Sequence, residues 1–241
     1  MPSFTSAQQH AAFDARASGI SDRLNWLRAA VLGANDGIVS TAGLVLAVAG
    51  ASPTHAALLT AGVAGMVAGA LSMAVGEYVS VSTQRDTEQA AVALERLELA
   101  QLPDIELREL AALLSQKGMS KETAEQAARE MTQHDALAAH SEIELGIKPG
   151  EYTNPISASL ASAAAFALGA LVPLLAVLLA PVSQMVLITV IAVVAALCIT
   201  GISSAVLGHT PVLRATLRNV LGGLLAMGIT YAIGRAVGAQ L

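Results

Sequence analysis

The fold class of this 241-residue chain is decided by residues 157–180, SASLASAAAFALGALVPLLAVLLA, and residues 182–207, VSQMVLITVIAVVAALCITGISSAVL. Both stretches belong to a run of 62 residues, between Glu151 and Arg214, that contains no charged side chain. A helix needs about 20 apolar residues to cross a hydrocarbon core of about 30 Å, so this run predicts two membrane spans. The turn-forming Pro181 marks the break between them.

Three further spans are predicted on either side of this pair. A second charge-free run, residues 37–76, favours spans at about 29–50 and 56–81. A fifth span is predicted at 217–238, where arginines near both ends must reach outward to the interface. We therefore predict an all-α polytopic membrane protein with five transmembrane helices.

The composition excludes several other classes of protein. The chain is 54% hydrophobic and only 13% charged, whereas a soluble domain is about 25% charged. Its net charge of −5 and its few aromatic residues argue against nucleic-acid binding. The single cysteine, Cys198, lies in an apolar run and cannot form a disulfide within the chain, so we expect no redox chemistry.

The positive charges predict which side of the membrane each loop occupies. Twelve of the thirteen Lys and Arg residues fall on one side of the five predicted spans. The positive-inside rule makes that side the cytoplasm, which then contains residues 1–28 and 82–155, with residues 29–81 and 156–241 forming the membrane part. The N-terminus has no apolar signal stretch, and the compact chain suits a bacterial plasma membrane.

The segment 82–155 is strongly acidic. It contains fourteen of the eighteen Asp and Glu residues but only seven cations. We predict three helices in it: the first continues from span 2 to Gln101, the second opens at Pro103, and the third runs from Ser120 to about Gly146. Leucines are expected to supply the apolar stripes that pack these helices together: Leu94, Leu97, Leu107, Leu110, Leu113 and Leu114.

Two pairs of glutamates in this segment have metal-ligand spacing. Glu95 and Glu98, like Glu106 and Glu109, are three residues apart and so share a helix face. Because a helix break at Pro103 separates the pairs, they can face each other. Four close carboxylates repel one another, and a bound dication would relieve that repulsion. The alternative is an acidic face that is merely solvated.

A further pair lies on the third predicted helix. His140 and Glu144 are four residues apart and so project from one face. Carboxylate oxygens with an imidazole suit Mn²⁺, Fe²⁺ or Zn²⁺ better than Cu⁺. These ions are expected as passing substrates, and no permanent cofactor is expected.

Two carboxylates fall inside the predicted spans. Asp36 and Glu77 each lie eight residues, or about 12 Å along a helix, from a flanking arginine, so antiparallel neighbours would hold them at similar depth. Met73 lies one turn deeper than Glu77 on the same face. Such carboxylates could bind a proton in one state and a cation in the other, although Glu77 could instead reach the interface.

Small residues recur in both acid-bearing spans. Gly33-x-x-x-Gly37 and Gly65-x-x-x-Gly69 permit close helix approach and often mark packing or dimer faces. In a symmetric dimer, every polar group of a shared path would be repeated around the two-fold axis.

Four motifs in these segments resemble one known family. They are Asn35-Asp36-Gly37-Ile38-Val39-Ser40, Ser72-Met73-Ala74-Val75-Gly76-Glu77-Tyr78-Val79-Ser80, Gln84-Arg85-Asp86 and Glu144-Leu145-Gly146-Ile147. Their order and identity are similar to those of the vacuolar iron transporter family, from about Arg23 to the end of the chain.

The resemblance implies a homodimer that exports Fe²⁺, often also Mn²⁺, from the cytosol in exchange for protons. It implies that Asp36 and Met73, with Glu77 adjacent, belong to the transport pathway. It also implies a cytoplasmic metal-binding domain whose carboxylates are Glu95, Glu98, Glu106, Glu109 and Glu144. Some family members have methionines where this chain has His140 and Ser141, a departure that favours Mn²⁺ or Zn²⁺ as cargo.

Two alternatives to transport differ in class. A membrane enzyme is disfavoured because the sequence contains no G-x-S-x-G or H-E-x-x-H motif and no second intramembrane aspartate. A membrane-anchored metal sensor or assembly protein would use the acidic segment without moving ions.

Overall fold

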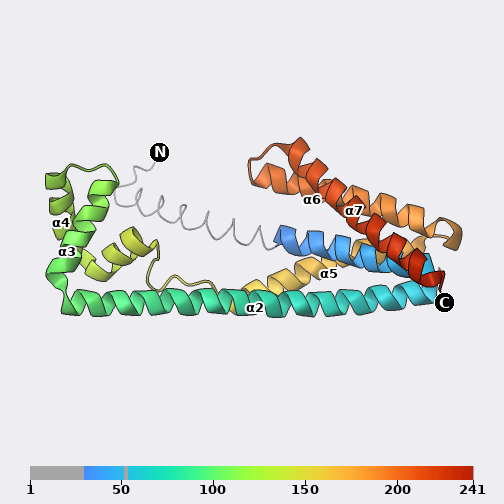
Figure 1. The fold of residues 1–241 in the computed structure, drawn as a ribbon, viewed down its shortest axis with the longest axis horizontal. Helices are drawn as coiled ribbons and strands as arrows, with labels where there is room; N and C mark the ends of the chain where they lie inside the picture. The colour runs from blue at the N-terminus through green and yellow to red at the C-terminus, as the bar shows by residue number, and fades with distance from the viewer. Residues whose placement is uncertain (1–29, 52–53, 241) are drawn as a thin grey trace, which may run out of the picture. The chain divides into compact units, whose positions relative to one another are not determined.

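The structure, a computed structural model, describes residues 30–51 and 54–240, and their regular secondary structure is entirely helical (Figure 1). Five helical stretches are long and apolar enough to cross a membrane: Ala30–Ala51, α2 (His55–Gln101), α5 (Pro155–Leu179), Val182–Leu207 and α7 (Val212–Gly238). The fourth consists of a 3₁₀ turn, Val182–Gln184, followed by α6 (Met185–Leu207). The predicted all-α fold with five spans is confirmed. The predicted N-terminal segment, residues 1–28, lies outside the described residues.

The chain divides into two compact units. One, the membrane unit, comprises the described residues up to Glu77 together with those from Ile156 onward. The other, the acidic unit, is Tyr78–Pro155. Helix α2 contributes to both. It has 47 residues and is therefore about 70 Å long, more than twice the hydrocarbon thickness of about 30 Å, so its charged C-terminal part lies outside the apolar span.

The helix Ala30–Ala51 is the centre of the membrane unit. Its residues Ile38, Ala42 and Leu46 pack with Val193 and Leu197 of α6 in one buried cluster. On another face, its Val45 and Ala49 join a second cluster with residues of α2, α5 and α6. One helix with two apolar faces thus holds the surrounding helices together.

Glycines allow this helix to touch its neighbours backbone to backbone. A Cβ added at Gly37 would overlap the Phe166 carbonyl of α5, and one added at Gly234 of α7 would overlap the Ala47 carbonyl. Apolar attraction does not draw helices together in lipid, so close van der Waals packing between small residues stabilises the bundle instead.

The acidic unit is a small helical bundle. Helix α3 (Pro103–Gln116) begins with Pro103 in its first turn, and α4 (Lys121–His140) begins after Ser120, whose side chain accepts a hydrogen bond from the Thr123 backbone N–H. A π-helix, Ser141–Leu145, follows and ends at Gly146 in the left-handed conformation, with φ 68°. The three predicted helices are thus present, the first as the end of α2 and the third as α4 with its π-helical extension.

The core of this unit lies between α3 and α4 rather than on α2. Its buried members are Leu110, Leu114, Ala124, Ala128 and Ala139. The expectation that Leu94 and Leu97 also pack inside is wrong, because each is 56% exposed within the single chain. Glu95 occupies the inward face of that turn instead, at 2% exposed.

The backbone contact at Gly234 generates a stability prediction. Gly234→Ala places a methyl group against the Ala47 carbonyl, so we expect a loss of about 1–3 kcal/mol, typical of overpacking, and a lower melting temperature in detergent. Gly228→Ala is the matched control, because an added Cβ there meets no atom within 4 Å among the described residues. Equal melting temperatures for the two variants would contradict the tight α7 packing.

Candidate metal centre

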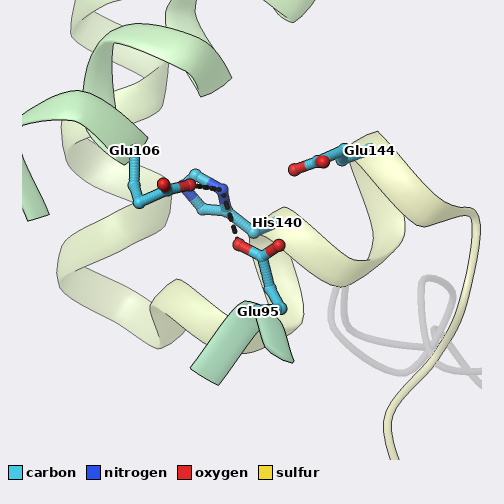
Figure 2. A group of neighbouring side chains, drawn as sticks. All are labelled: Glu95, Glu106, His140 and Glu144. Carbon is cyan, nitrogen blue, oxygen red and sulfur yellow. Dashed lines mark ion pairs between the residues drawn. The ribbon is translucent and has the colours of Figure 1, made fainter. Parts of the chain in front are cut away.

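Four side chains from the acidic unit converge on one point. Figure 2 shows Glu95, Glu106, His140 and Glu144 directed toward a common space. Each contributes one ligand atom, and these four atoms all lie within 4.8 Å of one another. Glu95, Glu106 and His140 are buried, at 2%, 5% and 0% exposed, whereas Glu144 is exposed. The arrangement can hold a cation that enters from the side of Glu144.

Each of the four residues comes from a different place in the fold. Glu95 projects from α2, Glu106 from the first turn of α3, His140 from the last turn of α4, and Glu144 from the π-helix. Pro103 makes this possible, because it starts a new helix direction between Glu95 and Glu106.

Two irregularities in the backbone direct the last two ligands. Helix α4 is interrupted at Asp135 (φ −157°, ψ 97°), whose Oδ1 accepts a hydrogen bond from the Ala138 backbone N–H and so caps the segment that leads to His140. The π-helix then widens the turn that carries Glu144, and such turns are frequent at functional sites. Sequence reasoning missed both, although an aspartate is an ordinary helix-capping signal.

The distances within the cluster are short. Nδ1 of His140 lies 3.1 Å from Oε1 of Glu95 and 3.7 Å from Oε2 of Glu106. Neither ring nitrogen of His140, nor Oε1 of Glu95, has a hydrogen-bond partner in the part of the chain that the structure describes. Buried polar atoms are normally satisfied, so unpaired ones require an explanation.

Electrostatics in the cluster favour the uncharged forms of its members. Burial, and after it the neighbouring charges of Glu144 and Glu106, raise the pKa of Glu95 to about 7. The pKa of Glu106 is likewise raised, first by burial and then by the charge of Glu109. Burial lowers the pKa of His140, so its imidazole is neutral near pH 7. A dication would reverse the balance by stabilising the carboxylates.

The four predicted glutamates do not converge equally. Glu95 and Glu106 point into the cluster, whereas Glu98 is half-buried and Glu109 exposed, and neither is among the four convergent ligands. Their charges still raise the pKa of Glu95. They therefore add negative potential around the cluster.

The membrane unit contains a separate cavity of about 210 Å³. Its lining includes the predicted pathway residues Asp36 and Met73, together with residues that sequence reasoning did not single out as ligands: Ser40, Thr41, Leu44, Gly65, Gly69, Ser72 and Phe166. Glu77 does not line the cavity and is half-buried elsewhere on α2.

Asp36 and Thr41 are two of the polar residues in this lining. Asp36 is exposed in the single chain, and no ion pair involving it occurs among the described residues. The hydroxyl of Thr41, which is 1% exposed, also lacks a hydrogen-bond partner in residues 30–51 and 54–240. The absence of side chains at Gly65 and Gly69 leaves room for Leu44 and Phe166 to line the space.

The chain has five apolar spans and a compact acidic unit with convergent ligands. These features define its class of protein as an integral membrane protein with a candidate metal centre outside its spans. A model of the VIT family matches residues 27–235, and the chain belongs to that family. Because this is a family of transporters, the chain is not an enzyme. The resemblance inferred from the sequence motifs is thereby confirmed.

Relatives with assigned names cover most of the chain. It is 41% identical over 211 residues to the vacuolar iron transporter of Acanthamoeba castellanii. The aligned residues cover 87% of this chain and 77% of that protein. It is 37% identical over 219 residues to vacuolar iron transporter homolog 2.1 of Arabidopsis thaliana, covering 90% and 84% of the two chains. For vacuolar iron transporter homolog 5 of Oryza sativa, the identity is 39% over 217 residues, covering 90% and 82%.

The raised carboxyl pKa values predict how metal binding depends on pH. The carboxylates must lose their protons to bind a dication, so the affinity should fall as the pH drops through about 7, by about tenfold per pH unit for each proton displaced. Isothermal titration calorimetry of the full chain in detergent, at several pH values between about 6 and 8, measures how the metal affinity changes with pH. Glu95→Gln should weaken binding and flatten the profile, whereas the exposed Glu142→Gln should change neither. A profile that is flat above pH 6 in the unaltered chain would contradict the assignment.

The capping of α4 by Asp135 generates a second prediction. Asp135→Ala removes the hydrogen bond to the Ala138 N–H and lets His140 reorient, so metal affinity should fall by about tenfold, as for other outer-shell partners. Asp135→Asn keeps an oxygen acceptor and should restore most of the affinity. If Asp135→Ala and Asp135→Asn bind metal equally well, the cap does not position His140.

Proposed function

We propose that the chain transports divalent metal ions across a membrane, carrying Fe²⁺ or Mn²⁺ out of the cytosol in exchange for protons. The convergence of Glu95, Glu106, His140 and Glu144 carries the proposal, because buried carboxylates and a buried imidazole form a donor set for a dication. The relatives' names as iron transporters support iron as a substrate, and the same donors also suit Zn²⁺.

The two sites have different roles in this proposal. The acidic unit captures metal from the cytoplasmic solution, and Glu98 and Glu109 raise the local cation concentration through their charge. In the membrane unit, Asp36 and Met73 offer an oxygen and a thioether to the passing ion, with Glu77 as a neighbouring acid. An ionised carboxylate is costly in the membrane, so a metal ion and a proton would neutralise Asp36 in turn.

A homodimer completes the proposed pathway. Asp36 is exposed in the single chain, and a second copy could enclose it with a symmetry-related set of polar groups. The distribution of Lys and Arg in the sequence favours an N-terminus and an acidic unit in the cytoplasm, and the compact chain suits a bacterial plasma membrane.

The competing candidate is a metal sensor or assembly protein. It is favoured by one observation, since all four convergent ligands lie within the acidic unit and could bind metal without any ion flux. Metal uptake by the purified chain in sealed vesicles separates the two functions.

Substitution of Asp36 tests the pathway. In proteoliposomes that are acidic inside, Asp36→Asn should reduce metal uptake at least about tenfold, because the intramembrane carboxylate that binds ion and proton is lost. Asp86→Asn, which alters an exposed residue of the acidic unit, is the control and should transport normally. Replacing Glu95 and Glu106 by glutamine should raise the half-saturating metal concentration more than it lowers the maximal rate. Undiminished flux in Asp36→Asn would reject the assignment.

A further inference from the structure

The cluster of Glu95, Glu106, His140 and Glu144 contains one nitrogen-bearing side chain. His140 is 0% exposed, and neither of its ring nitrogens makes a hydrogen bond in the described part of the chain. A buried imidazole used only for packing normally has at least one ring nitrogen satisfied, because an unpaired buried polar group costs about 1–3 kcal/mol. Here Nδ1 has only the carboxylates of Glu95 and Glu106 beside it, as ion-pair contacts.

The position of the ring has the geometry of a shared coordination shell. First-row dications bind nitrogen and oxygen at about 2.0–2.2 Å, so two ligands of one ion lie about 3.0 Å apart at right angles and about 3.4 Å apart in a tetrahedron. Nδ1 of His140 lies 3.1 Å from Oε1 of Glu95 and 3.7 Å from Oε2 of Glu106. Figure 2 shows the ring between these two carboxylates, which identifies Nδ1 as the inward nitrogen.

We propose that His140, through Nδ1, is the residue that makes this centre select Fe²⁺, Co²⁺ and Zn²⁺ over Mn²⁺, Mg²⁺ and Ca²⁺. Imidazole suits the former ions, whereas an all-oxygen shell of carboxylates and water suits the latter. The inference rests on the proposed metal capture by the acidic unit, but not on transport. It narrows the proposed cargo from Fe²⁺, Mn²⁺ or Zn²⁺ to Fe²⁺ and Zn²⁺, and it reverses the expectation from the sequence that His140 favours Mn²⁺.

Competitive titration of the tag-free, full-length chain in detergent tests the selectivity. In His140→Gln, the ring nitrogen is replaced by an amide and the carboxylates remain. Affinity for Zn²⁺ and Co²⁺ should fall at least about tenfold, while affinity for Mn²⁺ should change less than about threefold. The matched control is His134→Gln, an exposed histidine on the same helix, which should leave all three affinities unchanged. A uniform loss for all three ions, or no loss for any, would overturn the proposal.

A spectroscopic measurement keeps the test decisive if His140→Gln folds poorly. Pulsed electron paramagnetic resonance of one equivalent of Cu²⁺ detects imidazole nitrogen directly. A nitrogen signal in the unaltered chain that persists in His134→Gln supports the assignment, and its absence from the unaltered chain overturns it. Vesicle flux reports separately on transport: nitrogen coordination without flux would reject the proposed function alone, and flux with an all-oxygen centre would reject this inference alone.

Discussion

The burial of carboxyl groups close to one another is the constraint on which the acidic unit depends. Glu95 and Glu106 lie in nearly closed surroundings with Glu144 close by, and the loss of solvation, followed by the neighbouring charges, makes their ionised forms unfavourable there. The cluster can become neutral in two ways, by binding protons or by binding a dication, so its charge depends on the pH and the metal concentration of the solution. The apolar core between α3 and α4 and the cap at Asp135 hold these groups in place.

The membrane unit meets a different constraint. Lipid supplies no hydrophobic attraction between helices, so the bundle relies on small residues that bring backbones into contact. The contacts of Gly37 and Gly234 fix the helix Ala30–Ala51 against α5 and α7, and the same helix carries Asp36 and Thr41 to the cavity. The packing contacts and the cavity therefore use one helix, with glycines on some faces and oxygen-bearing side chains on others.

The sequence predicts where the helices lie along the chain better than it predicts which of their side chains point inward. Charge-free runs identify the five spans because the cost of burying charge in lipid acts locally, and Pro103 and Ser120 mark helix starts by local backbone chemistry. Which glutamate of each pair points inward depends on the rotation of a helix against its partners, so Glu98 and Glu109 could not be told from Glu95 and Glu106 by spacing. For the same reason Leu94 and Leu97 were assigned to the wrong face. The interruption at Asp135 has a local signal, because aspartate can cap a helix, but an aspartate alone does not show that a helix is interrupted there.

The π-helix Ser141–Leu145 gives this part of the centre a tolerance to changes in chain length. A π turn accommodates one more residue than an α turn, so deleting a single residue there would tighten the turn into a regular α-helix and leave the residues beyond it facing nearly the same way. In a regular helix such as α3, the same deletion would rotate everything beyond it by about 100°. The loss of one residue is therefore expected to be tolerated better in this short segment than in the middle of α3.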